Sequence, residues 1–422
     1  MTRPRRSQER STTVTQTVFT TILLIAMTGC GRENLTASNI ADFIENNRPD
    51  QAEDTGTSGA PNQANNETDV NIVTPPQLAG GGEPDLPAIL FEYANVVFPA
   101  HFNNRGGRGG SVTAADNTPG NNAITNAGAT LGRVLFYDKR LSANNTIACA
   151  SCHQQAAGFA DPVALSTGFE GGLTGRRSMG LTNARFYERG RFFWDERAAA
   201  LEDQVLMPIQ DSVEMGMNLE DLEDLVEKLA ATPFYAPLFE QAFGSSTVSS
   251  TRISRSLAQF VRSMVSYQSR YDRAFVNGNP NFRNALTAQE DRGRRIFDQS
   301  CANCHETNGQ VSDQPRNTGL DVVTVDQGAG RGRFKSPSLR NIAVRAPYVH
   351  DGRFGSLREV VDFYNTGIQA NRELDNRLRN NNGTPRRMNM DANEVNALIA
   401  FLNTRTDEVF LGDVRFSDPF VE

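Results

Sequence analysis

The sequence contains the motif Cys-x-x-Cys-His twice, and this repeat constrains the fold more than any other feature of the chain. In each copy, two thiols can bond the edge of a porphyrin and the adjacent histidine can ligate its iron, which is the pattern of c-type haem attachment. Zinc ribbons place their two cysteine pairs about 15–20 residues apart, whereas most of a domain separates these pairs. We therefore predict two covalently bound haems, attached at Cys149, Cys152 and His153 and at Cys301, Cys304 and His305.

The N-terminus has the features of an export signal. A basic start is followed by an apolar run over residues 18–27 that is too short to be a membrane-spanning helix. Cys30, the one cysteine outside the haem motifs, follows a Met-Thr-Gly segment that resembles a bacterial lipoprotein processing site. We predict a lipoprotein signal peptide over 1–29 and lipidation of Cys30, with a signal peptide cleaved nearby as the alternative. Resemblance to bacterial lipoproteins implies that Gly31, rather than Asp, after this cysteine favours anchoring at the outer membrane, on the periplasmic side of the cell envelope.

Composition divides the rest of the chain into a tether and a folded part. Residues 30–86 are rich in Asn, Asp, Glu, Gly, Pro and Thr, so they cannot bury enough apolar surface to offset the entropy lost on folding. We predict a flexible tether there. Length then suggests two domains, over 87–280 and 281–422, with one haem motif each. The net charge of −7 argues against binding to nucleic acid.

Hydrophobic periodicity indicates an all-α fold with a haem packed into each of two small cytochrome c-like domains. Segments 129–137 and 291–297 form a weak internal repeat, and we predict both to be helices that end just before the haem cysteines. Apolar residues at three- and four-residue spacing predict further helices over 219–229, 253–265 and 392–402. Strand-like alternation is scarce.

Several segments match family signatures, in order, at 193–197 (Phe-Trp-Asp-Glu-Arg), 201–208, 213–215, 336–341 and 346–353 (Ala-Pro-Tyr-Val-His-Asp-Gly-Arg). With the haem motifs, they resemble the bacterial dihaem cytochrome c peroxidase and MauG family from about residue 86 to the C-terminus. The resemblance implies an oxidoreductase. In this family the haem ligated here by His153 meets the oxidant, and the haem ligated by His305 holds an electron at higher potential.

The resemblance assigns catalytic roles to residues between the two haem motifs. Glu214 matches the family's distal glutamate, which takes a proton from one peroxide oxygen and returns it to the other. Gln204 and Pro208 match neighbours in the same pocket. Trp194, the only tryptophan in the chain, matches a residue that relays electrons between the haems. The alternatives are a solvated loop carboxylate for Glu214 and a large core aromatic residue for Trp194.

The second axial ligand of the His305 haem separates the subfamilies. Alignment with the family places Tyr364 at this ligand position, where peroxidases have Met and MauG-like enzymes have Tyr. A phenolate favours ferric iron much more than a thioether does. Met388 and Met390 are the alternative ligands, and helical core packing is the alternative role for Tyr364.

The first haem lacks the gate that is usual in the peroxidases. No histidine occurs between His153 and His305, so the histidine that caps the resting iron in those enzymes has no counterpart in this chain. We predict that the first haem is five-coordinate or water-bound at rest and needs no reductive activation. Met179 and Tyr187 are the alternative capping residues.

The resemblance also implies a calcium ion between the haem domains, bound by an Asn side chain and by backbone carbonyls. Arg345 and Pro347 can supply the carbonyls, but the Asn position holds Arg177, so the sequence leaves calcium open. We expect His350 to orient the surroundings of the second haem. We expect His101 to be a surface or packing residue.

Two classes of function follow from these features. The first is a dihaem peroxidase that reduces hydrogen peroxide to water with electrons from a small cytochrome c or cupredoxin. Its variant is a MauG-like oxidase that acts on a protein or another organic substrate. The second class is a non-enzymatic electron carrier, in which both irons have six ligands and Glu214 has no role. Family members are often dimers, which leaves a homodimer open.

Overall fold

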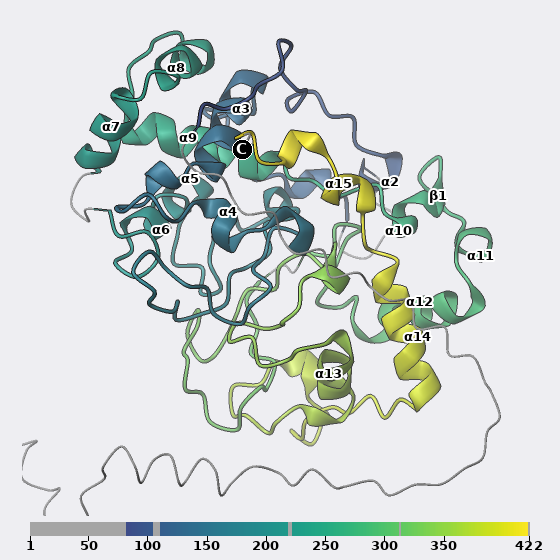
Figure 1. The fold of residues 1–422 in the computed structure, drawn as a ribbon. Helices are drawn as coiled ribbons and strands as arrows, with labels where there is room; N and C mark the ends of the chain where they lie inside the picture. The colour runs from purple at the N-terminus through teal and green to yellow at the C-terminus, as the bar shows by residue number, and fades with distance from the viewer. Residues whose placement is uncertain (1–81, 104–109, 218–221, 312–313, 421–422) are drawn as a thin grey trace, which may run out of the picture. The chain divides into compact units, whose positions relative to one another are not determined.

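The computed structural model describes residues 82–103, 110–217, 222–311 and 314–420 (Figure 1). All of these residues belong to one compact unit of the chain, residues 73–422. The predicted signal peptide, Cys30 and the predicted tether up to residue 81 lie outside the described residues. Among the described residues, no helix has both the length and the apolar character needed to cross a membrane.

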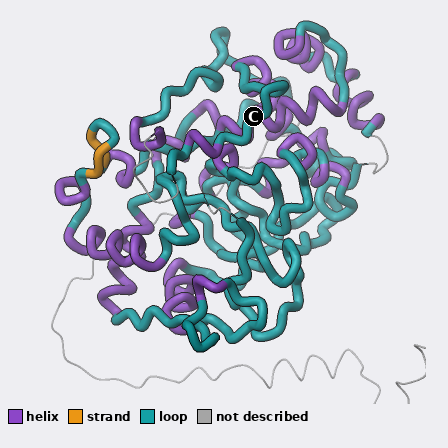
Figure 2. Tube along the Cα trace, turned by 180° about the vertical axis from the view of Figure 1, so that it is seen from behind, coloured by secondary structure: helices purple, strands orange, loops and turns teal. Residues whose placement is uncertain are grey.

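The described part of the chain consists of helices joined by long loops, in agreement with the predicted helical fold class (Figure 2). Its only strands are β1 (Phe275–Val276) and β2 (Asn279–Pro280), which form a short antiparallel hairpin. A π-helical turn, Phe363–Gly367, follows α13. The α-helices are α2 (Ala100–Asn103), α3 (Asn126–Tyr137), α4 (Cys149–Cys152), α5 (Leu201–Gln204), α6 (Met207–Gln210), α7 (Glu223–Ala230), α8 (Tyr235–Phe243), α9 (Ser250–Ser263), α10 (Arg270–Arg273), α11 (Phe282–Ala285), α12 (Ala288–Ser300), α13 (Leu357–Asp362), α14 (Ala392–Asn403) and α15 (Glu408–Leu411).

Helices α3 and α9 form the centre of a first hydrophobic core. Thr125 caps α3 and Ser249 caps α9, each by accepting a hydrogen bond from a backbone N–H of the first turn, at 3.0 and 3.3 Å. The helices cross so closely that a β-carbon at Gly132 would lie 2.0 Å from the Ser256 carbonyl oxygen. Buried apolar side chains at helical spacing pack around this crossing: Leu131, Val134, Leu135, Leu257, Phe260 and Val261.

Helices α12 and α14 repeat this arrangement in a second core (Figure 1). Thr287 and Asp391 cap them, each within a capping box completed by a glutamate three residues on. A β-carbon at Gly293 in α12 would lie 1.8 Å from the Ala397 carbonyl oxygen. The internal repeat in the sequence therefore has a packing cause, because Gly132 and Gly293 both allow a partner helix to cross closely.

The two helices predicted to end just before the haem cysteines end differently. Helix α12 ends directly before Cys301, as predicted. Helix α3 ends at Tyr137, and a loop separates it from Cys149, so the predicted position of this end is wrong. Asp138 has an extended backbone, and its carboxylate accepts a hydrogen bond at 2.8 Å from the backbone N–H two residues on. This residue ends α3 and starts a separate turn.

The other three predicted helices correspond to α7, α9 and α14 with small shifts of their ends. The first residues of the helix predicted over 219–229, up to residue 221, lie outside the described residues. Helix α8 was not predicted.

The C-terminal segment returns from the second core to the first, where the yellow end of the ribbon lies in Figure 1. Phe410, Phe416 and Phe420 are buried in the same cluster as the side chains of α3 and α9. Tyr137 Oη donates a hydrogen bond to the Phe416 carbonyl at 2.6 Å, and Phe420 pairs with Pro84 in an isolated bridge. The predicted division at residue 281 does not include this return, and the division itself stays a prediction.

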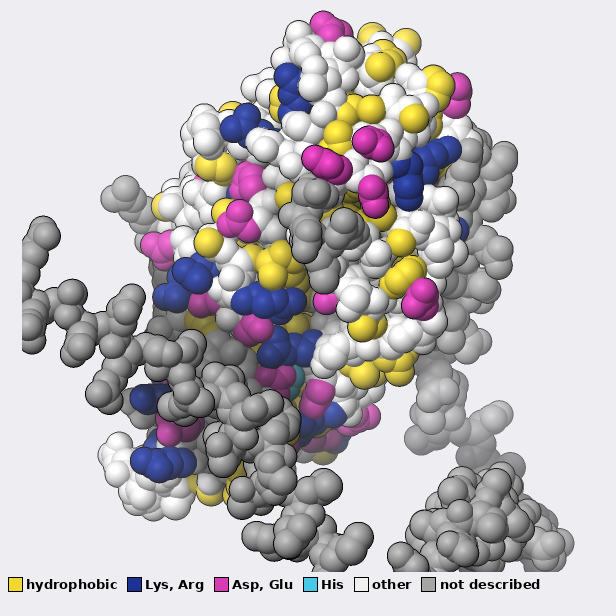
Figure 3. Space-filling model, turned by 90° about the vertical axis from the view of Figure 1, so that its left-hand side faces the viewer, with side chains coloured by type: hydrophobic (Ala, Val, Ile, Leu, Met, Phe, Trp, Pro, Cys, Tyr) yellow, Lys and Arg dark blue, Asp and Glu magenta, His cyan; other side chains and the backbone are white. Residues whose placement is uncertain are grey.

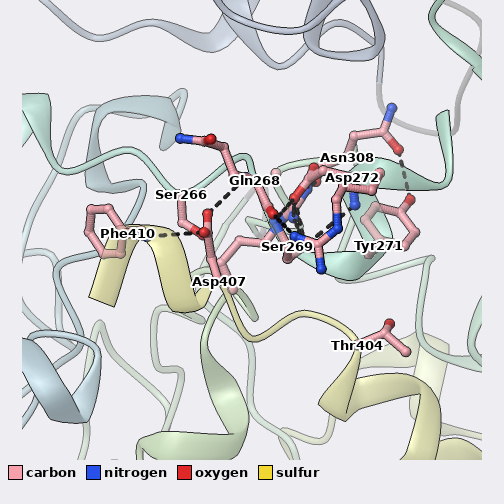
Figure 4. A network of polar contacts seen from close by, with 12 residues as sticks. Ser266, Gln268, Ser269, Tyr271, Asp272, Asn308, Thr404, Asp407 and Phe410 are labelled. Carbon is pink, nitrogen blue, oxygen red and sulfur yellow. Dashed lines mark hydrogen bonds and ion pairs between the residues drawn. The ribbon is translucent and has the colours of Figure 1, made fainter. Parts of the chain in front are cut away.

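A buried polar network joins α2 and α10 to the second half of the chain. Figure 4 shows Ser269, Asp272 and Asn308 within it. Asp272 accepts hydrogen bonds from Ser269 Oγ at 2.6 Å and from Arg340 Nη2 at 2.7 Å, and His101 Nε2 lies 2.8 Å from the same carboxylate. Burial alone would raise the pKa of Asp272, but Arg340, His101 and Ser269 hold it well below its usual value. Of the two roles expected for His101, the surface role is wrong, because its side chain is buried and bonded.

Candidate haem and peroxide site

The first haem motif forms the short helix α4, with His153 at its C-terminal end. His153 Nδ1 lies 2.9 Å from the carbonyl oxygen of Phe159, and because a carbonyl can only accept, the ring proton belongs on Nδ1. Burial lowers the pKa of His153, which favours the neutral ring. This leaves Nε2 as the nitrogen that would ligate the iron of an attached haem. The Sγ atoms of Cys149 and Cys152 stand for the thioether sulfurs of an attached haem.

A cavity of about 550 Å³ opens beside this motif, a volume that suits a cofactor or small-molecule site. Its lining includes all the catalytic residues predicted for the first haem, far apart as they are in the sequence, and both alternative capping residues. These lining residues are Met179, Tyr187, Trp194, Gln204, Pro208 and Glu214.

The turn that follows α6 holds Glu214 at this cavity. Asp211 Oδ1 accepts hydrogen bonds from Val213 N at 2.8 Å and from Glu214 N at 3.0 Å, and the Glu214 carbonyl accepts one from Phe169 N at 3.1 Å. Burial, and then the nearby Asp211 carboxylate, raise the pKa of Glu214 to about 7. A carboxyl with this pKa can both accept and donate a proton near neutral pH, as general acid–base catalysis requires.

Trp194 contacts segments that follow both haem motifs. Its indole Nε1 donates a hydrogen bond to the Arg177 carbonyl at 2.7 Å, and its own carbonyl accepts one from Lys335 N at 2.8 Å. The ring centroid of Trp194 lies 6.5 Å from that of His350 in an edge-on arrangement, and His350 stacks at 3.7 Å on Phe334. Trp194 is therefore anchored both to the loop of the first motif and to the chain beyond the second.

Tyr364 lies near the second haem motif. Burial raises the pKa of its phenol above the usual value, and the neighbouring thiols of Cys304 and Cys301 raise it further, while a hydrogen bond with Thr318 opposes them. Tyr364 belongs to the π-helical turn, a distortion that often occurs at functional sites. The structure therefore places the predicted ligand beside the second pair of haem cysteines.

The alternative ligands Met388 and Met390 lie on a loop that forms hydrogen bonds with Asn365, the residue that follows Tyr364 in the sequence. Met388 N donates a hydrogen bond to the Asn365 carbonyl at 3.0 Å, and Met390 N donates one to Asn365 Oδ1 at 2.7 Å. The Met390 side chain is partly buried against the second core, which gives it a packing role.

Buried cations around the second motif fit the carboxylates of a haem. Arg405 is 1% exposed and lies over three aromatic rings, yet its Nε and Nη1 have no hydrogen-bond partner among the described residues. Nε and Nη1 of Arg345 are also buried and have no hydrogen-bond partner among the described residues. Burial, and then cations that include Arg405 and Arg345, lower the pKa of His305 to about 4, so both arginines lie near this predicted iron ligand. Haem propionates would pair with these otherwise costly buried charges.

Sequence reasoning missed Lys335, a buried lysine in the wall of the first cavity. Its Nζ lies 3.9 Å from the ring centroid of Tyr187 and donates a hydrogen bond to the Arg191 carbonyl at 3.0 Å. Burial lowers its pKa to about 7. An ammonium group here fits a propionate of the first haem. A lone lysine is usually exposed, so its only signal in the sequence was its place directly before the 336–341 segment.

The residues at the expected calcium site do not fit the ion. Nη2 of Arg177 donates hydrogen bonds to the carbonyls of Arg345 and Asp161, both at 2.8 Å, so a cationic group already engages one of the expected calcium ligands. Nor does the described part of the chain contain a group of three or more His, Cys, Asp and Glu side chains that could hold a metal ion. The structure therefore gives no support to calcium at Arg345 and Pro347.

The fold and the site define a class of helical proteins with two c-type haem motifs. One of the two motifs lies beside a cavity that is lined by Glu214, whose pKa is raised to about 7. A family model described as di-haem cytochrome c peroxidase matches residues 126–281, and a cytochrome c model matches residues 290–406.

Individual proteins give the same result. The methylamine utilization protein MauG of Methylorubrum extorquens is 34% identical over 299 residues, which cover 68% of this chain and 80% of the relative. The cytochrome c551 peroxidase of Nitrosomonas europaea is 32% identical over 297 residues, which cover 66% and 80%. A solved structure of a MauG-like protein associated with microbial copper homeostasis aligns with a TM-score of 0.64 at 30% identity, covering 72% of this chain and 96% of that one.

The chain therefore belongs to the dihaem cytochrome c peroxidase and MauG family. It is an oxidoreductase, and the family implies two covalently bound haems. Since relatives carry both names, membership does not decide between the reactions.

Proposed function

We propose that this enzyme reduces hydrogen peroxide to water at the haem ligated by His153, with electrons from a small cytochrome c or cupredoxin that pass through the haem ligated by His305. The observation that carries the proposal is Glu214, whose carboxyl has a pKa of about 7 and lines the cavity beside the first haem motif. Relatives named as cytochrome c peroxidases support the same reaction.

The residues of the cavity supply the proton chemistry. A bound haem supplies the iron position at which peroxide is held and reduced. Ionised Glu214 takes a proton from one peroxide oxygen and returns it to the other as the O–O bond breaks. Gln204 lines the same cavity and has an amide that can donate a hydrogen bond to peroxide. One peroxide, two electrons and two protons give two waters, so the redox partner supplies both electrons and solvent supplies both protons.

Trp194 is the proposed relay between the haems. Its support is structural, since hydrogen bonds to Arg177 and Lys335 fix its position against segments that follow both motifs. A side chain fixed in this way holds its ring in one place between the two segments, which suits electron transfer.

The proposed first haem has an open position at rest. Tyr187, one alternative cap, donates its hydroxyl hydrogen to the Glu196 carboxylate and packs its ring against Lys335. This engagement of Tyr187 supports the open position, which leaves Met179 as the alternative cap.

A second candidate function is oxidation of a protein or another organic substrate. The observation that favours it is Tyr364 beside Cys301 and Cys304, because the resemblance assigns a tyrosine ligand to MauG-like enzymes. A phenolate stabilises ferric iron, so the second haem would give up an electron more readily than a Met-ligated one. Such a haem suits storage of oxidising equivalents on both irons.

Electron transfer also needs a surface on which a redox partner can dock. On the described part of the face in Figure 3, basic and acidic side chains are interspersed, with apolar side chains among them. No one sign of charge dominates this face, so docking there would depend on local shape and contact more than on long-range steering. A homodimer remains an additional proposal from the family resemblance.

We also propose that lipidation of Cys30 holds the enzyme on the periplasmic side of the outer membrane, on the basis of its lipoprotein-like N-terminus. A Cys30→Ala variant is expected to move from the membrane fraction to the soluble fraction when cells are fractionated. Retention of the variant in the membrane fraction would contradict the anchor.

Turnover of hydrogen peroxide with a reduced small cytochrome as donor tests the proposed reaction. The Glu214→Gln variant is expected to lose activity by about 10²–10⁴-fold, because the proton shuttle is removed. Glu170→Gln, an exposed glutamate on the neighbouring loop, is the matched control and should retain wild-type turnover. Wild-type protein that carries both haems but consumes no peroxide would rule out the peroxidase.

A further inference from the structure

We propose that two buried arginines, Arg177 and Arg345, form a built-in cationic tie between the segments that follow the two haem motifs, in place of the calcium ion that the resemblance implies. The proposal concerns how the chain is held together and whether it needs a metal. It is therefore independent of whether the cavity reduces peroxide.

The side chain of Arg177 bonds to both segments at once. It is only 5% exposed, and its Nη2 donates to the carbonyls of Asp161 and Arg345, both at 2.8 Å, while Nη1 donates to the Ser178 carbonyl at 2.9 Å. Asp161 and Ser178 follow the first haem motif, and Arg345 follows the second. One nitrogen atom therefore bridges the two segments.

The backbone of Arg177 adds two contacts to this bridge. Its N–H donates to the His350 carbonyl at 2.8 Å, and its carbonyl accepts the hydrogen bond from Trp194 Nε1 at 2.7 Å. The tie therefore also positions the only tryptophan of the chain.

Arg345 enters the loop of the first motif from the opposite segment. A β-carbon at Gly158 would lie 3.0 Å from Arg345 Cγ, and one at Gly180 would lie 2.3 Å from Arg345 Nη1. Its Nη2 donates a hydrogen bond to the Ser338 carbonyl. Because neither glycine has a side chain, the Arg345 side chain can pack closely against both of them, which indicates a specific packing contact.

The positive charges of Arg177 and Arg345 disfavour binding of a calcium ion beside them. Calcium binds oxygen ligands at about 2.3–2.6 Å, so an ion on the Arg345 carbonyl would sit no more than about 5.4 Å from Arg177 Nη2, given the 2.8 Å hydrogen bond. At that distance the like charges repel strongly. A guanidinium group is not deprotonated in proteins, so both arginines are charged at neutral pH. Together they carry the same formal charge as one calcium ion.

Metal analysis and thermal unfolding of the wild-type protein with both haems attached test the proposal. We expect far less than one calcium ion per chain after dialysis, and a melting temperature that neither EGTA nor added calcium chloride changes. One calcium ion retained per chain, or a melting temperature lowered by EGTA, would overturn the proposal, since a ligand that binds the native state stabilises it.

Variants test the tie itself. Arg177→Asn removes the three side-chain hydrogen bonds and supplies an amide oxygen, so we expect a lower melting temperature that added calcium partly restores. Arg177→Lys keeps the positive charge but loses the several N–H donors of the guanidinium group. We therefore expect a lower melting temperature that added calcium does not change.

Arg358→Asn, at an exposed arginine paired with Asp362, is the matched control and should melt like the wild type. If Arg177→Asn melts like the wild type, the tie does not exist. If it does not fold, the wild-type and Arg177→Lys measurements still decide.

Discussion

Glu214 is the residue whose protonation should set the pH dependence of the first haem. Only the ionised carboxylate can accept a proton from peroxide, and the pKa of Glu214 is raised to about 7. The rate of reaction with peroxide should therefore rise as pH increases through about 7 and level off above it. Stopped-flow measurements across this range check the profile. Glu170→Gln should keep the inflection and Glu214→Gln should lose it, and an inflection that persists in Glu214→Gln would assign the titration to another group.

Tyr364 should control the reduction potential of the second haem. Replacement by Met removes a phenolate that favours ferric iron, so Tyr364→Met is expected to raise the potential and to change the visible spectrum of this haem. A spectroelectrochemical titration measures both changes. Met388→Leu and Met390→Leu are the matched controls. If either Leu variant changes the spectrum while Tyr364→Met does not, a methionine is the ligand.

Some site residues could be predicted from the sequence and others could not. The haem cysteines and histidines follow from a local motif, and Glu214 and Trp194 from a resemblance over short segments. Lys335 and Arg405 were missed because burial of a lone cation depends on contacts between distant segments. Arg177 was recognised as an unusual residue for a calcium ligand, but only the structure shows the three carbonyls that it bonds.

Among the elements, helices were the easiest to predict. The apolar periods of α9 and α14 are clear because one face of each helix packs in a core. The return of the C-terminal segment was not predicted, since the contact of Phe416 with Tyr137 spans most of the folded chain and leaves no local pattern. The same segment carries Asp407, which accepts hydrogen bonds from Ser266 Oγ at 2.9 Å and Gln268 N at 2.8 Å (Figure 4).

The network of Asp272 should make the link between α2, α10 and Arg340 sensitive to acid. Its pKa is held below the usual value, so its contribution to stability is complete above the unfolded-state pKa of about 3.9 and is lost as pH falls below that value. Asp272→Asn should lower the free energy of unfolding by about 3–5 kcal/mol at neutral pH, because it leaves Arg340 buried without its partner.

Urea unfolding of both proteins at neutral and acid pH checks this prediction. The variant has no carboxyl at this position, so its stability should fall less steeply with acid than that of the wild type. Asp362→Asn removes an exposed ion pair with Arg358 and should change the free energy of unfolding by less than about 1 kcal/mol. Equal acid dependence in Asp272→Asn and the wild type would show that Asp272 is not the sensitive group.

In the molecule as a whole, the two haem sites differ although their motifs are alike. The first has a cavity with Glu214, and the second has Tyr364 near its cysteines. Trp194, Arg177 and Arg345 connect the segments that follow the two motifs. This asymmetry supports the proposed division of labour, with peroxide chemistry at one haem and electron storage at the other.

Mixing the fully oxidised enzyme with hydrogen peroxide, with no reductant present, tests this division most directly. We predict a rapid change in the visible spectrum of wild-type protein and of Glu170→Gln, because an open first haem needs no reduction before it reacts. The change should be slower by about 10²–10⁴-fold in Glu214→Gln. A resting spectrum in which the first haem is low-spin, together with no reaction until the protein is reduced, would contradict the account.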